Sequence, residues 1–593
     1  MEDRPWYAHW PPGLPTSLDY PQIPVTLFLE SAARRWPDRP AIIFQVGEEV
    51  TTYAELYEKS RRFATALARL GVRKGDRVAV QLINTPHTAM VYFGILLAGA
   101  VYTPCNPLLS FRELLRILND SGAETFVIFD MFMDKFTPIR HDTGVKRLIV
   151  TGVQEFIPPH APLDVKGYGG RTYSLLQLLN DTPDDPPLVK IDPERDLAHI
   201  AYTGGTTGVP KGVPLTHEMV VITIIQQAIW SSGGRPIVDQ DGLFQVIDPL
   251  ESEMREDWEY PTVYGCSSWL VIVPWAHAMG INAYLNGPVM RGDTMVVHPR
   301  FDLPAYMNDI EKYKITICGG APQLLVAMLN YPGVEKLDLS SVRVIGSGAA
   351  PLPVEILEGL QRLMPNGMVV EGYGLTELTL MATVNPTNRS GLRKVGSVGI
   401  AAFDTDIKIV DLDDPDIEIG FREYGEVCVR GPQMMHGYWK NPEETASVIR
   451  DGWLLTGDIG YLDEDGYLFL VDRKKDMLIY NGHNVYPREL EELLFTHRAV
   501  QNCAVIGKPH SLTQEIPKAF VVPKPDAQVT ERELMDYVAI RVADYKQIRE
   551  IEFVPELPVS YAGKVLRREL RRWELERIKA GETAPETEEA LGL

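Results

Sequence analysis

Between residues 20 and about 200, the sequence alternates amphipathic helical segments with short apolar segments of strand length. TYAELYEKSRRFATALARLG has the helical apolar period and ends on Gly71, and RVAVQLI (77–83) is typical of a buried strand. TFVIFD (125–130) and KRLIVTG (146–152) are further apolar runs of the same kind. Because helices that alternate with strands usually connect parallel neighbours, this pattern predicts an α/β fold with a mainly parallel sheet.

The best candidate for a membrane span is AMVYFGILLAGAVYTPC (89–105), which carries no charge. A helix needs about 20 apolar residues to cross a bilayer, and this run is short and interrupted by Gly94, Gly99 and Pro104. We therefore expect a buried helix, a glycine stop and a β-branched strand. The N-terminus, MEDRPWYAHWPPGLP, has neither a basic region nor an apolar run, so no signal peptide is expected.

Charge and cysteine usage narrow the class of partner and the compartment. The formal net charge is −22 over 593 residues, which argues against nucleic acid as a general partner. The five cysteines are scattered without a C-x-x-C pair, which favours a reducing cytosol. We predict a cytoplasmic protein, either a monomer or a homodimer, and leave open a peripheral contact with a membrane.

The chain changes character after Asp476. Pro487 opens an amphipathic segment, RELEELL, and CAVIG and KAFVV are short apolar runs. Thr530 and Glu533 have the spacing of a capping box ahead of LMDYVAIRV. Residues 477–593 are therefore predicted to form a small separate α+β domain, whose polar end (about 574–593) is expected to be frayed.

The stretch YTGGTTGVPKGVPLTH (202–217) carries four glycines, four threonines and one lysine. Glycines allow backbone N–H groups to approach an anion, hydroxyls add donors, and lysine supplies a compact cation, so the stretch predicts a phosphate site. It differs from the P-loop because Lys211 is followed by Gly212, with no hydroxyl there for Mg²⁺.

Four further motifs follow in order: EGYGLTE (371–377), TGD (456–458), DRKKD (472–476) with YNGHNVYP, and SYAGKVLRREL (560–570). Together with the glycine loop, from about residue 25 to 573, they resemble the adenylate-forming superfamily of acyl-CoA synthetases, aryl-CoA ligases, luciferases and adenylation domains. TGGTTGVPKG, EGYGLTE, VDRKKDM and GKVLRREL look most like those of the bacterial fatty acid–CoA ligases.

The resemblance implies a large N-terminal domain (1–472) with mainly parallel sheets, a hinge (473–476) and a small mobile α+β domain (477–593). It also implies two chemical steps. A carboxylate attacks the α-phosphorus of MgATP to give an acyl-adenylate and pyrophosphate, and the thiol of coenzyme A then displaces AMP. Such chemistry needs charge neutralisation and positioning more than covalent help.

The resemblance assigns roles to residues of the N-terminal domain. The β- and γ-phosphates would be held by the glycine loop, namely Thr203, Gly204, Gly205, Thr206, Thr207, Gly208 and Lys211. The adenine would lie against Tyr373 and Gly374 and the backbone of Gly348, Ala349 and Ala350. Glu377 would hold Mg²⁺ and Thr376 a phosphate oxygen, while His277 would lie beside the reacting carboxylate.

Other roles fall on the TGD motif and the C-terminal part of the chain. Asp458 would accept hydrogen bonds from both ribose hydroxyls, with Arg473 nearby. Lys564 resembles the lysine that bridges the carboxylate and the α-phosphate during adenylation. Lys475 would be the hinge, and Gly482 would line the path of the pantetheine arm of coenzyme A after the domain rotates.

The acid substrate is expected to be a medium- or long-chain fatty acid. Short-chain acetyl-CoA synthetases place tryptophan where this chain has Gly374, so glycine there is expected to open the acyl pocket. The small residues at 318–321, in the segment that flanks the acyl pocket of the family, also predict an open pocket. The segment 239–260, with eight acidic residues and one arginine, exceeds what the family usually needs and is expected to be a solvated loop or a lid over the acyl entrance.

Three alternatives remain at this stage. An aryl or hydroxy acid would also fit a roomy apolar pocket, and the acyl acceptor could be a carrier-bound pantetheine or oxygen instead of coenzyme A. The third is a non-catalytic ATP-binding module. The presence of Lys211, Glu377 and Lys564 together argues against that last class, because a module without catalysis has no chemical need for all three.

Overall fold

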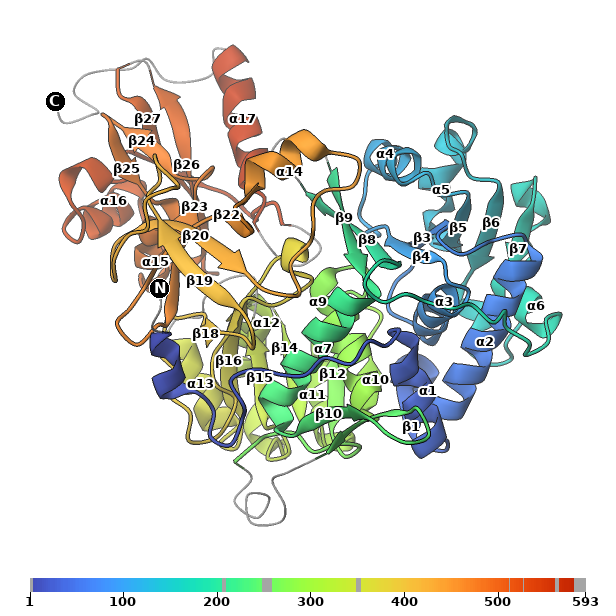
Figure 1. Cartoon of the computed structure of the whole chain (residues 1–593). Coiled ribbons are helices and arrows are strands. Elements are labelled where there is room, and N and C mark those ends of the chain that lie inside the picture. Colours follow the sequence, from blue (N-terminus) through green and yellow to red (C-terminus); the bar gives the residue numbers. More distant parts are fainter. Residues whose placement is uncertain are drawn as a thin grey trace. The chain divides into compact units, whose positions relative to one another are not determined.

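The computed structural model of the chain describes residues 4–204, 210–247, 259–320, 322–347, 354–510, 512–525, 527–559 and 565–580. The chain forms two compact units (Figure 1). The first comprises residues 1–406, 429–454 and 465–467, and the second comprises 407–428, 455–464 and 468–593. The predicted hinge at 473–476 stays a prediction, because this division does not test motion.

A seven-stranded sheet forms one half of the first unit, with the order β7-β6-β5-β3-β4-β8-β9. Every pair is parallel except the last, β8 with β9. The strands are β3 (Arg77–Gln81), β4 (Val101–Pro104), β5 (Thr125–Phe129), β6 (Arg147–Thr151), β7 (Thr172–Ser174), β8 (Leu197–Gly204) and β9 (Pro210–Thr216). The predicted parallel α/β arrangement is confirmed.

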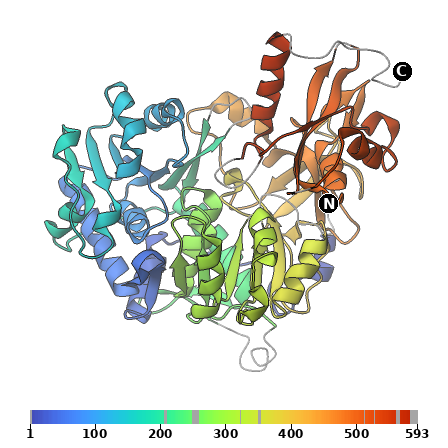
Figure 2. The ribbon, with the colours of Figure 1, turned by 180° about the vertical axis from the view of Figure 1, so that it is seen from behind.

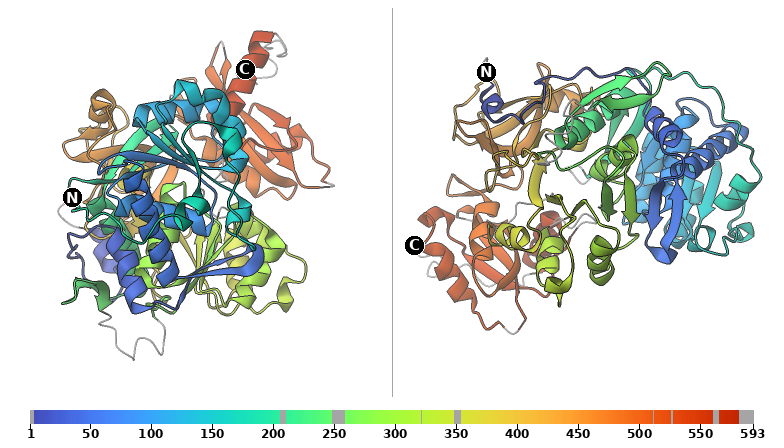
Figure 3. Two further views of the ribbon diagram at one scale, coloured as in Figure 1. Left: turned by 90° about the vertical axis from the view of Figure 1, so that its right-hand side faces the viewer. Right: turned by 90° about the horizontal axis from the view of Figure 1, so that it is seen from below.

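Amphipathic and buried helices precede or connect these strands. They are α1 (Thr26–Arg35), α2 (Tyr53–Arg69), α3 (Pro86–Leu97), α4 (Phe111–Ser121), α5 (Met133–Phe136) and α6 (Leu175–Asn180). Helix α2 packs along α3 and α1 along α2 (Figure 3). Helix α3 and strand β4 confirm the interpretation of residues 89–105 as a buried helix followed by a strand. Among the described helices, none combines the length and the apolar character that a membrane span requires.

A nine-stranded sheet forms the other half of the first unit, in the order β18-β17-β16-β15-β14-β12-β13-β1-β2. Its six central strands run parallel, from β16 to β1. The strands are β1 (Pro40–Phe44), β2 (Glu49–Thr52), β12 (Ser268–Val271), β13 (Thr294–Val297), β14 (Ile317–Gly320), β15 (Val344–Ser347), β16 (Met368–Tyr373), β17 (Thr383–Val384) and β18 (Ile400–Ala401). The carboxyl ends of parallel strands therefore meet along one edge of this sheet.

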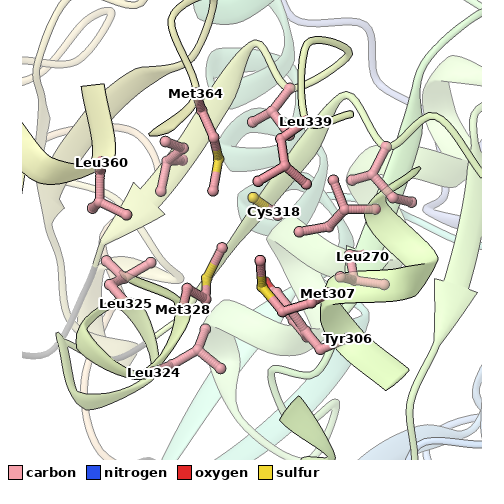
Figure 4. Close-up of a cluster of buried hydrophobic side chains, with 14 of the residues drawn as sticks. Leu270, Tyr306, Met307, Cys318, Leu324, Leu325, Met328, Leu339, Leu360 and Met364 are labelled. Atoms are coloured by element: carbon pink, nitrogen blue, oxygen red, sulfur yellow. The ribbon is translucent and has the colours of Figure 1, made fainter. Parts of the chain in front are cut away.

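Helices cover one face of the nine-stranded sheet: α11 (Leu303–Lys312), α12 (Pro322–Leu329) and α13 (Val354–Leu363), seen in green to yellow in Figure 2. Buried side chains from both layers form one apolar cluster, in which Leu270, Tyr306, Cys318, Met328 and Leu360 take part (Figure 4). Removing apolar surface from water stabilises such a core by roughly 25 cal/mol for each Å² buried, and this is the main source of its stability.

Helix α7 (His217–Ser232) follows the β8–β9 hairpin and is buried along most of its length. Its neighbours in sequence are the small hairpin of β10 (Arg235–Val238) and β11 (Phe244–Ile247). Asp239, the first residue of the predicted acidic insertion, forms an ion pair of 2.5 Å with Arg35. Residues 248–258 of that insertion lie outside the described residues, so its role as a loop or lid stays a prediction.

Several other described elements of the first unit are short. Among them are α9 (Ala278–Ile281), the π-helical turn Asn282–Asn286, α10 (Gly287–Arg291), α14 (Pro442–Val448) and β21 (Ile449–Arg450). Two sheets account for the strands of the later part of the chain. The first contains β21 together with β19 (Asp406–Val410), β20 (Gly425–Arg430), β22 (Trp453–Leu462) and β23 (Leu468–Arg473).

The second of these sheets lies entirely in the second unit, in the order β25-β24-β27-β26 with β28 beside β27. Its strands are β24 (Leu478–Tyr480), β25 (His483–Val485), β26 (Val500–His510), β27 (Gln514–Pro523) and β28 (Glu550–Phe553). The helices of this part of the chain are α15 (Pro487–Phe495), α16 (Glu531–Ala539) and α17 (Arg567–Ala580). The hydroxyl of Thr530 accepts the N–H of Glu533 at 3.2 Å, as an N-cap, and α16 ends earlier than predicted, at Ala539.

Two histidines of the first unit, His199 on β8 and His217 at the start of α7, are buried as neutral side chains. Burial is the largest cause that lowers the pKa of His199 to about 3 and that of His217 to about 4. In the unfolded chain both have a pKa of about 6.5. The unfolded state therefore binds protons first as the pH falls, and the free energy of unfolding drops between about pH 6.5 and 4.

We expect that drop to be about 1.4 kcal/mol per pH unit for each of these histidines. His199→Gln should reduce the slope of unfolding free energy between pH 6 and 5 by that amount, measured by urea denaturation. His141→Gln, the same substitution at an exposed position, provides the control. An equal slope in all three proteins would show that His199 titrates normally in the folded state.

Candidate active site

Several predicted site residues lie at the carboxyl edge of the nine-stranded sheet. Tyr373 is the last residue of β16, and two residues separate it from the short 3-10 turn Thr376–Leu378, which carries Glu377. His277 lies in the segment after β12, at the start of α9. Ligands of open α/β sheets bind at this edge, so the topology brings the predicted adenine, metal and carboxylate residues to one side of the sheet.

The turn that carries Thr376 and Glu377 is tightly built. A Cβ atom added to Gly374 would lie 1.6 Å from the carbonyl oxygen of Leu380, so only glycine fits there. Thr379, a β-branched residue, has φ of +61°, which is a strained conformation for such a side chain. Its hydroxyl donates to the carbonyl of Gln433 at 2.7 Å, and this contact holds the turn in its conformation.

This geometry corrects the sequence-based interpretation of Gly374. The Leu380 carbonyl occupies the position that the Cβ of any larger residue at 374 would take. The expectation that glycine opens an acyl pocket at this point is therefore wrong. The small residues at 318–320 also have a packing reason. Cys318 is fully buried in the apolar core, and a Cβ on Gly319 would lie 2.1 Å from the carbonyl oxygen of Gly346.

The glycine loop joins the two strands of the β8–β9 hairpin. Thr203 pairs with Lys211 across the hairpin and Gly204 pairs with Pro210, so the two residues that flank the loop are adjacent. Lys211 is 12% exposed and forms an ion pair with Glu444 on α14. Its ammonium also lies 5.1 Å from the centroid of the Tyr438 ring, within the range of a cation–π contact.

Tyr438 contacts the second predicted motif as well. Its hydroxyl donates to Oε1 of Glu377 at 3.0 Å. Burial, followed by the charges of Glu377 and Glu444, raises the pKa of the Tyr438 hydroxyl well above its usual value, so it stays a donor. One tyrosine thus joins the lysine of the glycine loop to the glutamate of EGYGLTE.

The side chains present fit a magnesium ion bound through ATP. Glu377 uses one carboxylate oxygen for Tyr438, and its other lone pairs are available for a hard cation. Within the described ranges, no three acidic, histidine or cysteine side chains gather into a cage. Mg²⁺ that binds with a nucleotide uses one or two carboxylates together with phosphate oxygens and water, and Glu377 offers one such carboxylate.

His277 has an exposed side chain and caps a tight turn. Its backbone N–H donates to the carbonyl of Pro274 at 3.0 Å. A Cβ on Gly280 would lie 1.8 Å from that same carbonyl oxygen, so the turn requires glycine at 280. The imidazole is thus held on a rigid turn, and its predicted place beside the reacting carboxylate stays a prediction.

In the second unit, Asp458 and Arg473 lie opposite each other on β22 and β23. Asp458 is buried, and its Oδ1 is 3.2 Å from Nε of Arg473. The TGD segment of β22 is fixed by its neighbours, since the Thr456 hydroxyl donates to Val427 and the Gly457 N–H donates to Glu426. Arg473 therefore lies beside Asp458 as expected, and their role in binding ribose stays a prediction.

Lys475 and Gly482 lie in the segment that joins β23 to β25. The surrounding protein, and then the Arg473 charge, lower the pKa of the Lys475 ammonium. Gly482 follows Asn481 in the two-residue turn of the β24–β25 hairpin, where both have positive φ (+79° and +49°). This is the turn chemistry that such hairpins prefer.

The remaining predicted site residues lie outside the described residues: Gly205, Thr206, Thr207, Gly208, Gly348, Ala349, Ala350 and Lys564. What the structure does describe is the anchor of the segment after Lys564. Arg567 pairs with the buried Glu491 at 2.5 Å, and Arg571 pairs with Asp476 at 2.9 Å. Helix α17 is thereby tied to the DRKKD segment within the second unit.

Sequence reasoning missed Tyr438, Glu444 and Arg567. The first two lie in HGYWKNPEET, whose signal was an asparagine N-cap with proline and two glutamates in the first helical turn. Nothing in the sequence distinguishes Arg567 from the other arginines of α17, although it pairs with the buried Glu491.

Comparison with known proteins identifies the class that this fold and site belong to. Residues 29–439 match the AMP-binding enzyme family, and residues 489–564 match the C-terminal domain of AMP-binding enzymes. The chain belongs to the AMP-binding enzyme family.

Individual relatives match over nearly the full length. A long-chain-fatty-acid–CoA ligase of Bacillus subtilis (strain 168) is 36% identical, over 97% of this chain and 99% of that protein. The 4-coumarate–CoA ligase 2 of Oryza sativa subsp. japonica is 33% identical, over 93% of both chains. The crystal structure of the anthranilate CoA ligase AuaEII with anthranoyl-AMP has a TM-score of 0.80 at 25% identity, over 94% of this chain and 98% of that one.

Proposed function

We propose that this protein is an AMP-forming acyl-CoA synthetase that acts on medium- or long-chain fatty acids. The observation that carries the proposal is the meeting of Lys211 and Glu377 on Tyr438. It joins a phosphate-binding cation to a carboxylate suited to Mg²⁺, which are the groups that phosphoryl chemistry requires. The full-length similarity to a long-chain-fatty-acid–CoA ligase supports the choice of acid.

In the first step the acid attacks the α-phosphorus of ATP, and an acyl-adenylate and pyrophosphate are formed. The hairpin loop with Lys211 binds the β- and γ-phosphates, and Thr376 binds a phosphate oxygen. Tyr373 packs on the adenine, and Asp458 holds the ribose hydroxyls with Arg473 beside it. Glu377 would hold Mg²⁺, which would supply charge neutralisation for the phosphates when bound. Lys564 stabilises the charge that develops between the carboxylate and the α-phosphate.

In the second step the thiol of coenzyme A attacks the acyl carbon, and AMP leaves. We propose that the C-terminal domain from 477 onward rotates about Lys475 between the two steps, and that the turn at Gly482 then lines the pantetheine path. The tie between Asp476 and Arg571 supports this proposal, because it would move α17 together with the end of the hinge segment.

A second candidate substrate class is favoured by one specific observation. A 4-coumarate–CoA ligase is 33% identical to this chain over 93% of its length. An aryl acid would undergo the same two steps at the same residues. The choice between the two acids therefore depends on the acyl pocket and not on the phosphate machinery.

The test is a panel of carboxylic acids from C2 to C18, together with aryl and hydroxy acids, scored for AMP release that depends on coenzyme A. We expect kcat/KM to be highest for a fatty acid of medium or long chain. Each buried methylene adds about 0.8 kcal/mol, so neighbouring even chain lengths should differ by roughly tenfold until the pocket is full. A maximum for coumarate or another aryl acid would transfer the assignment to the second class.

A further inference from the structure

We propose that Tyr438 is a positioning residue that sets Lys211 and Glu377 in place for MgATP. The proposal deepens the proposed function and rests on the phosphate role of Lys211 and the metal role of Glu377 given there. Tyr438 is 61 positions from Glu377 and far from Lys211 in sequence, yet it contacts both through different parts of one side chain.

The backbone around Tyr438 is fixed to the glycine-loop hairpin. The N–H of Tyr438 donates to the Thr445 hydroxyl at 2.9 Å, at the start of α14. The N–H of the next residue, Trp439, donates to the carbonyl of Gly212 at 2.8 Å. A Cβ on Gly212 would lie 3.0 Å from the Trp439 Cβ, so the two segments pack tightly. The tyrosine ring is therefore carried by a rigid support.

The hydroxyl and the ring face of Tyr438 act on different groups. The hydroxyl donates a hydrogen bond to Oε1 of Glu377, and this bond fixes the orientation of the carboxylate and of its remaining lone pairs. Outer hydrogen bonds of this kind orient metal-binding carboxylates, and their loss typically costs about 10- to 100-fold in metal affinity or activity. The ring face stabilises the ammonium of Lys211 on the other side.

Glu444 completes the arrangement. Its carboxylate takes one of the three N–H donors of Lys211 and leaves two for phosphate oxygens. The Lys211 side chain is mostly buried, so this pairing fixes the orientation of the ammonium before the nucleotide arrives. Tyr438 and Glu444 together thus preorganise a cation and a carboxylate that come from different sheets.

The test compares two nucleotides by titration calorimetry on the full chain. MgATP would contact both Lys211 and Glu377, whereas AMP lacks the β- and γ-phosphates and the metal ion. Tyr438→Phe keeps the ring and removes only the hydroxyl, so we expect the Kd of MgATP to rise about tenfold and the Kd of AMP to stay within about twofold. Tyr438→Leu removes the ring as well and should raise the Kd of MgATP further.

Tyr20 provides a matched control in the same unit. It is also half-buried, and its hydroxyl donates to the carboxylate of Asp404 at 2.7 Å. Tyr20→Phe should leave both dissociation constants unchanged. The proposal is overturned if Tyr438→Phe binds MgATP as the parent does, or if MgATP and AMP weaken by the same factor. Neither titration needs an acid, so a failure of the acid panel would contradict the proposed function without deciding the role of Tyr438.

Discussion

Lys564→Ala is expected to slow pyrophosphate release and overall thioester synthesis by about 100- to 1,000-fold. The proposed function places the Lys564 ammonium where negative charge develops as the carboxylate attacks the α-phosphorus. Removing one such preorganised group typically costs about 3–4 kcal/mol of transition-state stabilisation. The loss should appear in kcat for adenylation, measured as acid-dependent release of pyrophosphate.

The second step separates this role from general stability. When chemically made acyl-AMP and coenzyme A are supplied, Lys564→Ala should form thioester at the parent rate, because rotation would already have carried the lysine away. Arg568→Ala, which removes a positive charge from an exposed position of α17, should be normal in both steps. If adenylation and thiolysis fall together while the melting temperature holds, the proposed domain rotation does not operate in this protein.

Gly374→Ala is expected to lower adenylation about 100-fold. The added methyl group would collide with the Leu380 carbonyl, and the turn that carries Thr376 and Glu377 would have to shift. Displacing catalytic groups by about 1 Å can cost about 100-fold in rate. We expect acid-dependent pyrophosphate release to fall by this factor with little change in the melting temperature of the first unit, because Gly374 itself is exposed.

Gly144 is the matched control for this substitution. Nothing lies within 4 Å of a Cβ added there, so Gly144→Ala should keep the parent rate. Adenylation at the parent rate in Gly374→Ala would mean that the turn can move without disturbing Glu377. The strained Thr379 beside it would then have no bearing on catalysis.

Much of the fold followed from local sequence patterns. The apolar period of α2, the short runs of β5 and β6 and the glycine that follows the helix within residues 89–105 are local features, and the structure confirms them. The boundaries were less accurate, as in α16, because helix ends depend on the packing of the last turn. The order of strands in the nine-stranded sheet was not predicted, since its neighbours come from distant parts of the chain.

The site was predictable only where a motif carried the chemistry within a few residues. Lys211 and Glu377 could be found in this way, but Tyr438 could not, because its meaning arises from two contacts made in the folded protein. Gly374 shows the opposite error. A glycine can reflect a wide pocket or a close backbone neighbour, and only the position of the Leu380 carbonyl distinguishes the two.

The central claim is that the acid attacks the α-phosphorus of ATP, and the most direct measurement follows one oxygen atom. A fatty acid labelled with ¹⁸O in its carboxylate should be incubated with the protein, ATP, Mg²⁺ and coenzyme A, and the AMP analysed by mass spectrometry. The account predicts AMP that carries one ¹⁸O atom, formed together with pyrophosphate and acyl-CoA. Unlabelled AMP, or ADP and phosphate in its place, would contradict it.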